Sequence, residues 1–299
     1  MKKFITIVLL IVTCCFLFAC QKETVVRLSF GPENPLEKDA NELTGDRFYQ
    51  EEQYQKAISS YERAVKAYEE AFGAGCEQSL EQNGKIIKCY VMLKEYEKAK
   101  EKCNELKNVI VNSETSSMMV VYNSYVIIAY GQADYETAIY YLELILEEYA
   151  ELDRLNSYPK IEIHYLLADA NKEIENYEEA LKHYQKQLDL ELYYHSVTKS
   201  MMSGVLPSGS EQLSFLKAGI CTYIDIGDLY GLMEDKENSL RYLYYAYDAA
   251  VEYQEREEMK PLLEENVIPE LMNYYLEDKG SAEGFESWLA SLGKEYKQN

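Results

Sequence analysis

One short pattern recurs along the chain and constrains its fold more than any other feature. The pattern is Glu-x-Tyr-x-x-Ala followed four residues later by a bulky side chain, or a close variant of it. The tyrosine of the pattern, or the residue in its place, is found at Tyr54, Tyr96, Tyr135, Tyr177 and Lys236. Self-similarity at such intervals is the signature of a chain that stacks one supersecondary unit. We therefore expect a repeat protein.

The spacing inside the pattern is that of an α-helix. The alanines Ala57, Ala99, Ala138 and Ala180 follow the tyrosines by three residues, and Ser239 replaces the alanine in the fifth copy. Four residues further on lie Tyr61, Cys103, Leu142, Tyr184 and Leu243. Three-plus-four spacing forms one stripe along a helix. A small residue on such a stripe allows two helices to cross closely, so the stripe predicts the second helix of a hairpin.

These motifs resemble the tetratricopeptide repeat (TPR), a helical hairpin with a small residue and an aromatic on its first helix and Tyr, Ala and bulky residues on its second. The resemblance implies an all-α fold, a right-handed α-solenoid of about five TPR-like hairpins over residues 37–256, closed by capping helices over 257–299. The intervals between successive copies are 42, 39, 42 and 59 residues, whereas the usual period is about 34. The extra length predicts longer helices, and the last interval indicates an insertion.

Two regions depart from the repeat. Residues 195–210 contain Ser203-Gly204 and Pro207-Ser208-Gly209, which predicts a loop after a long second helix. This loop is either functional, as long loops often are, or a tolerated surface insertion. Near the end of the chain, helices are expected at about 259–277 and 282–297, separated by Gly280-Ser281. They would form the capping hairpin that a terminal repeat needs.

The first residues have the pattern of an export signal. Lys2 and Lys3 precede an apolar run from Phe4 to Phe18, which is short for a membrane span. The run ends at Ala19-Cys20 and resembles a bacterial lipobox, which implies a signal peptide over residues 1–19 and lipidation of Cys20, followed by a flexible tether to residue 36. An uncleaved anchor or a plain secretory signal are the alternatives. The expected location is the cell envelope, on the extracytoplasmic side of a membrane.

Composition excludes some partners and points to others. The chain has 30 Lys+Arg and 52 Asp+Glu, a formal net charge of −22. Such a balance argues against binding nucleic acid, which requires cations to neutralise phosphates. It also argues against docking on an anionic membrane through a basic face, so membrane contact is expected through the lipidated Cys20. With 29 Tyr against 8 Phe and 1 Trp, many half-buried aromatic positions are expected.

No catalytic or metal-binding constellation is recognisable in the sequence. Phosphate-binding Gly-rich loops, nucleophile elbows, zinc-protease motifs and Cys-x-x-Cys pairs are absent. His164, His183 and His195 are interpreted as surface or turn residues. Cys103 occupies a core position and is expected as a buried thiol, although a Cys89–Cys103 or Cys76–Cys89 disulfide stays open. We therefore expect a protein without cofactor or enzymatic activity.

The resemblance to TPR proteins implies that a partner binds in a concave groove lined by first helices. The family's groove positions fall on Asp46, Tyr49, Lys88, Met92, Asn123, Ile127, Tyr130, Tyr165, Asp169, Lys172, Ile224 and Asp228. Asp46, Asp169 and Asp228 occupy equivalent positions, with tyrosines between them. Acidic and aromatic groups favour a basic or amphipathic peptide segment; alternatively, the carboxylates only keep the surface soluble.

The sequence thus predicts a non-catalytic, lipid-anchored TPR scaffold that holds a protein or peptide partner at a bacterial envelope. One alternative is a receptor for a small peptide ligand. Another is a glycan-binding nutrient-capture lipoprotein, a class usually equipped with large insertions and surface tryptophans. The short insertion and the lone Trp288 of this chain argue against that class.

Overall fold

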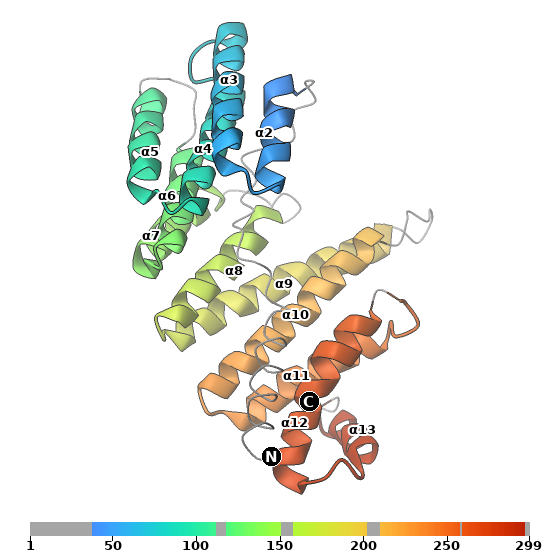
Figure 1. The fold of residues 1–299 in the computed structure, drawn as a ribbon. Coiled ribbons are helices and arrows are strands. Elements are labelled where there is room, and N and C mark those ends of the chain that lie inside the picture. The colour runs from blue at the N-terminus through green and yellow to red at the C-terminus, as the bar shows by residue number, and fades with distance from the viewer. Residues whose placement is uncertain (1–37, 112–117, 151–157, 202–209, 258, 297–299) are drawn as a thin grey trace, which may run out of the picture. The chain divides into compact units, whose positions relative to one another are not determined.

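A computed structural model describes residues 38–111, 118–150, 158–201, 210–257 and 259–296 of the chain (Figure 1). The predicted signal peptide, Cys20 and the predicted tether lie outside the described residues. Every regular element in the described ranges is a helix, as the repeat pattern predicted. The chain divides into two compact units, here called the N-terminal unit (described residues up to Asn176) and the C-terminal unit (from Tyr177).

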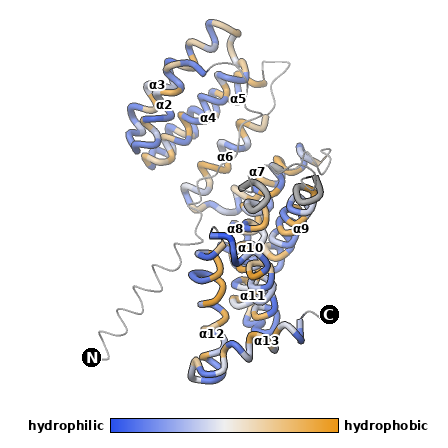
Figure 2. Tube along the Cα trace, turned by 90° about the vertical axis from the view of Figure 1, so that its right-hand side faces the viewer, coloured by the Kyte–Doolittle hydropathy of each residue, from blue (hydrophilic) through white to orange (hydrophobic). Residues whose placement is uncertain are grey.

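The N-terminal unit consists of helices that pair in order along the chain (Figure 1). They are α2 (Ala40–Gln50), α3 (Tyr54–Phe72), α4 (Glu77–Met92), α5 (Tyr96–Val111), α6 (Met119–Gly131), α7 (Tyr135–Glu148) and α8 (Tyr158–Glu173). Helix α2 packs on α3, α4 on α5, and α6 on α7, while α4 also packs on α6. Orange and blue residues alternate along α3 and α4 in Figure 2, as expected for helices with one buried face.

The C-terminal unit continues the pattern and ends in shorter helices. It contains α9 (Tyr177–Met201), α10 (Ser210–Leu232), α11 (Lys236–Val251), η2 (Leu262–Val267), α12 (Ile268–Lys279) and α13 (Phe285–Tyr296). Residues of η2, α12 and α13 share one hydrophobic core with α10 and α11. Trp288 belongs to this packing, with its ring 5.1 Å from that of Tyr275.

A second helix begins at each predicted tyrosine and at Lys236, and the turn before it has the same backbone geometry every time. A non-glycine residue adopts a left-handed conformation there: Glu52, Lys94, Ala133, Glu175 and Glu234, with φ between 55 and 61°. The following N–H bonds to a carbonyl five residues earlier, as from Gln53 to Phe48 at 2.8 Å and from Asp134 to Ala129 at 2.9 Å. This is the Schellman helix end, which usually employs glycine.

The predicted small and bulky positions form the cores of the hairpins. Ala57, Ala99, Ala138 and Ala180 are completely buried, as are the bulky residues that follow them by four. In the fifth hairpin the hydroxyl of Ser239 donates to the Gly227 carbonyl oxygen at 2.7 Å. Serine therefore satisfies its polar atom inside the core, which is why it can replace alanine at this position.

The insertion is partly helical, and the loop boundary predicted at residue 195 is wrong. Helix α9 runs to Met201 and α10 already begins at Ser210, so 195–201 extend the helix; residues 202–209 lie outside the description. The capping helices lie close to their predicted ranges. However, the first of them opens with the π-helix η2, just before Pro269, which has no N–H to offer to a regular helical ladder. Within the described residues, no helix is long and apolar enough to cross a bilayer.

Candidate partner-binding face

The predicted contact residues lie on the first helices of the hairpins: α2, α4, α6 and α8 in the N-terminal unit and α10 in the C-terminal unit. Asp46, Lys88, Asp169 and Asp228 each lie eight residues before the start of the next helix, so they share one register. Their surroundings nevertheless differ, and these differences decide which of them is available to a partner.

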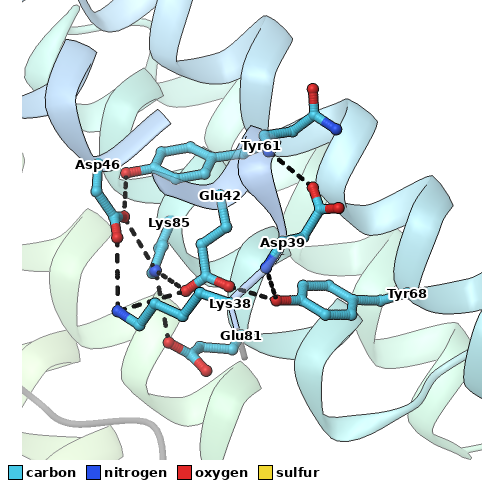
Figure 3. Close-up of polar contacts among 9 residues, drawn as sticks. Lys38, Asp39, Glu42, Asp46, Tyr61, Tyr68, Glu81 and Lys85 are labelled. Carbon is cyan, nitrogen blue, oxygen red and sulfur yellow. Dashed lines mark hydrogen bonds and ion pairs between the residues drawn. The ribbon is translucent and has the colours of Figure 1, made fainter. Parts of the chain in front are cut away.

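Asp46 is engaged within the fold (Figure 3). Its Oδ1 accepts a hydrogen bond from the Tyr61 hydroxyl at 3.0 Å and from the Lys85 ammonium at 3.1 Å. Its Oδ2 lies 3.6 Å from the ammonium of Lys38. With two lysines and one tyrosine around it, Asp46 is a structural link between α2, α3 and α4 rather than an acceptor open to a partner.

Lys85 is the centre of this polar cluster, here called the Lys85 cluster, which also includes Glu42 and Glu81. Its ammonium lies 3.0 Å from Glu42 and 3.6 Å from Glu81, in addition to the contact with Asp46. Glu42 is 4% exposed and accepts a 2.6 Å hydrogen bond from the Tyr68 hydroxyl. Burial alone would raise the pKa of Glu42, but the hydrogen bonds from Tyr68 and Lys85 outweigh it and lower the pKa.

Glu42, Lys85 and Tyr68 were not predicted from the sequence. Glu42 and Asp46 are spaced i,i+4 and so lie on one face of α2, a signal that was available but pointed equally to a solvated helix surface. The burial of the cluster depends on α3 and α4, and the register of α2 against them is a tertiary property.

The second group of predicted residues meets between α6 and α8. The hydroxyl of Tyr130, on α6, donates to the backbone carbonyl oxygen of Leu166, on α8, at 2.5 Å. The ring of Tyr130 lies edge-on to that of Tyr135, with centroids 5.7 Å apart and an interplanar angle of 87°. Burial first, and then the Asp169 carboxylate, raise the pKa of the Tyr130 hydroxyl, so the predicted pair Tyr130 and Asp169 are neighbours.

Asp169 is less firmly paired than Asp46. Its ion-pair partner is Lys172, on the same helix, at 3.8 Å, and its side chain is 18% exposed. Burial raises the pKa of Asp169, with Glu173 adding to the effect, while Lys172 and Tyr130 offset only part of it. After burial and Glu173, the Asp169 carboxylate also raises the pKa of Tyr135. We refer to Tyr130, Tyr135, Asp169 and Lys172 as the Asp169 cluster.

The remaining predicted residues of the N-terminal unit are only partly accessible. Asn123 and Ile127 are buried on α6, and Asn123 Oδ1 has no hydrogen-bond partner. Tyr49 is half-buried and packs edge-on against Tyr54 at 5.4 Å. Lys88 and Tyr165 are half-buried as well, and Met92 is exposed.

The two predicted residues of the C-terminal unit differ from one another. Asp228 is exposed on α10, whereas Ile224, one turn earlier, is buried in the core that α10 shares with α11. Asp228 therefore belongs to a solvated face of the C-terminal unit.

The described residues contain no group of three or more His, Cys, Asp or Glu side chains able to hold a metal ion. His164 is buried on α8, so its interpretation as a surface or turn residue is wrong, while His183 and His195 are partly exposed. Cys76, Cys89, Cys103 and Cys221 are free thiols, and burial raises the pKa of Cys89 and of Cys103 to about 12.

Comparison with known proteins supports the fold. No family model matches the chain, and no curated protein matches it. Among solved structures, a kinesin light chain-like protein of Podosopora anserina with nearly identical TPR-like repeats matches with a TM-score of 0.53 at 13% identity, over 73% of this chain and 96% of that one. A single-substitution variant of it gives 0.52 with the same identity and coverage. The MamA RS-1 ArsTM double mutant gives 0.45 at 12% identity, over 74% and 100%. The chain thus has a TPR-like fold of helical hairpins.

Proposed function

We propose that this protein is a non-catalytic scaffold that holds a protein partner on the first-helix face of its N-terminal unit. The observation that carries the proposal is the Asp169 cluster. Hairpin stacking brings Tyr130, Asp169 and Lys172 together from two first helices. Stacked hairpins form extended surfaces on which a peptide segment contacts several helices at once.

We further propose that the scaffold is anchored by a lipid on Cys20. The basic start, the apolar run from Phe4 to Phe18 and the position of Cys20 directly after Ala19 support this reading. An extended tether of about 15 residues would reach roughly 50 Å from the bilayer surface. Such an anchor places the partner at the bacterial cell envelope.

The scaffold proposal is tested by in-cell cross-linking followed by mass spectrometry. Wild-type protein is compared with a Tyr135→Leu/Asp169→Asn double variant, and Glu143→Gln/Tyr140→Phe on the exposed side of α7 is the matched control. We expect one envelope protein to be enriched by wild type and control and to be lost from the double variant. Absence of any enriched protein in all three samples would reject the scaffold.

The anchor is tested separately. A Cys20→Ser chain should no longer incorporate radiolabelled palmitate and should leave the detergent phase in Triton X-114 partitioning. Equal labelling of wild type and variant would show that Cys20 is not the acyl site.

A further inference from the structure

We propose that the Asp169 cluster is a seat for one cationic side chain, a lysine or arginine of a basic peptide segment. The inference deepens the proposed function and rests on it for its biological context, because it specifies what the first-helix face recognises.

The Asp169 cluster joins two aromatic rings to a carboxylate. The rings of Tyr130 and Tyr135 are nearly perpendicular, at 87° with centroids 5.7 Å apart, and Asp169 is the carboxylate near both. Aromatic faces joined with a carboxylate are the groups that attract an ammonium or guanidinium group. The chain uses this chemistry internally, since Lys85 lies 5.5 Å over the ring of Tyr61 and Arg241 lies 5.7 Å over that of Tyr296.

Asp46 and Asp169 share one register but differ in their partners. Asp46 is held by Lys85 at 3.1 Å, by Lys38 at 3.6 Å and by the Tyr61 hydroxyl. Asp169 has Lys172 at 3.8 Å, a residue of its own helix. The hydroxyl of Tyr130 is also within hydrogen-bonding reach of the carboxylate, but its single proton is shared with the Leu166 carbonyl oxygen. Asp169 therefore keeps acceptor capacity that Asp46 has already used.

The charge balance of the third hairpin favours a basic partner. Residues 118–150 contain five carboxylates and seven tyrosines but no lysine, arginine or histidine. In residues 40–111, by contrast, there are 13 acidic and 11 basic residues, and several of them form ion pairs such as Lys98–Glu95 and Lys102–Glu105. The third hairpin thus lacks internal cations, and a basic partner is its electrostatic complement.

A fourth observation comes from Asn123 on the same helix face. Asn123, Ile127 and Tyr130 are spaced i, i+4 and i+7 and therefore form one stripe of α6. Asn123 is 3% exposed, and its Oδ1 is a buried acceptor without a hydrogen-bond partner. An acceptor left unpaired costs free energy until a donor reaches it. It lies about 10 Å along the helix from Tyr130, at 1.5 Å per residue, and marks a second place on this stripe of α6 where a donor is missing.

The proposal is tested with a defined probe on the full-length chain. The probe is a fluorescein-labelled peptide of four lysines alternating with glycines, and the same peptide with acetylated lysines is its uncharged counterpart. Fluorescence anisotropy is measured at 0.15 M salt, where long-range attraction to the acidic surface is largely screened. We expect binding of the lysine peptide and at least tenfold weaker binding of the acetylated one.

Variants separate the seat from general electrostatics. Asp169→Asn should weaken binding at least tenfold, whereas Glu136→Gln, which removes one charge from the exposed surface of α7, should change it less than twofold. Tyr135→Leu should also weaken binding, and Lys172→Gln should strengthen it because the competing cation is gone. Circular dichroism melting shows that each variant is folded. Equal weakening by Asp169→Asn and Glu136→Gln, or no binding by the wild type, would overturn the proposal.

Failure of the seat and failure of the scaffold are distinguishable. If the in-cell partner is captured by wild type and by an Asp169→Asn single variant alike, the seat is wrong although the scaffold stands. If the lysine peptide binds through Asp169 while no protein is captured in cells, the seat stands and the scaffold is wrong.

Discussion

The hydroxyl of Tyr68 donates its proton to the Glu42 carboxylate across 2.6 Å, and its oxygen accepts the backbone N–H of Asp39 at 3.0 Å. One side chain of α3 thereby holds both the start and the first turn of α2. Helix α2 buries only Glu42 and Gly45, so it has little apolar area to fix it. The polar contacts of Tyr68 hold α2 in place instead. Burial, together with the hydrogen bond to Glu42, raises the pKa of Tyr68 to about 12.

Tyr68→Phe should therefore destabilise the N-terminal unit. A hydrogen bond to a charged group contributes about 1.5–3 kcal/mol when its loss leaves the charge buried, and we expect a loss of this order in the free energy of unfolding. Urea denaturation followed by circular dichroism measures it. Tyr140→Phe is the control, because Tyr140 is 57% exposed. A Tyr68→Phe protein as stable as this control would show that α2 is held otherwise.

The turns suggest a stabilising substitution. Ala133 has φ of 55°, a conformation that costs a residue with a Cβ about 1 kcal/mol and costs glycine almost nothing. Ala133→Gly should raise the free energy of unfolding by about 0.5–1 kcal/mol, part of the gain being lost to the greater freedom of glycine in the unfolded chain.

The control for this substitution is Ala99→Gly, in the buried helical stripe of α5. It should destabilise by about 1 kcal/mol or more, because glycine is a poor helix former. A destabilised Ala133→Gly protein would mean that the turn does not hold the left-handed geometry in solution.

Partial burial of His183 makes the free energy of unfolding depend on pH. Desolvation first, and then Lys186, lower the pKa of His183 from 6.5 to about 4. As the pH falls, His183 therefore takes up a proton in the unfolded chain at a higher pH than in the folded protein. The free energy of unfolding is highest above pH 6.5, where the imidazole is neutral in both states, and it decreases as the pH falls towards 4. At about 1.4 kcal/mol for each pKa unit, the loss stays below about 3.5 kcal/mol, and solvent that reaches the half-buried ring reduces it further.

The comparison is between wild type and His183→Gln, unfolded in urea at a series of pH values from 4 to 7.5. Carboxylates titrate in both proteins, so the difference between the two curves isolates the imidazole. We expect this difference to change between pH 6.5 and 4 and to be flat above 7. A constant difference over the whole range would contradict the assigned burial.

The sequence predicted the local properties of the structure better than the tertiary ones. The alanine stripes and the starts of the second helices, such as Tyr54 and Tyr177, follow from spacing along one helix and were predicted correctly. The left-handed turn residues were not predicted, because Glu52 and Lys94 carry no glycine signal. Helix α9 continues past His195 because the glycines and prolines that suggested a loop come only after residue 202.

For the candidate site, the sequence predicted only where its residues lie along their helices. Equal spacing placed Asp46 and Asp169 in equivalent positions, and the structure keeps that register. Whether each carboxylate is paired depends on the neighbouring helix, where Lys85 meets Asp46 across hairpins. Such contacts join residues about 40 positions apart, so periodicity within one helix does not reveal them.

Asp169 should cost the protein stability, which gives a last prediction. Burial raises the pKa of its carboxyl above the ordinary value, so Asp169 binds a proton more tightly in the folded protein than in the unfolded chain. The protonated carboxyl of Asp169 therefore stabilises the fold at pH values below its unfolded-state pKa, and this stabilisation is lost as the pH rises through its folded-state pKa. At neutral pH the ionised group is less favourable in the folded protein than in the unfolded chain.

Asp169→Asn should accordingly raise the free energy of unfolding at pH 7, by about 0.5–1 kcal/mol, and the gain should shrink as the pH falls below 4. Urea unfolding measures the free energy of unfolding at pH 7 and at pH 3.5. The control is Glu136→Gln, which removes the same negative charge from the exposed surface of α7. A carboxylate that weakens the fold yet is required for peptide binding would show the trade-off between stability and function that is typical of binding sites. A destabilised Asp169→Asn protein at pH 7 would instead make Asp169 a structural residue, held in place by Lys172.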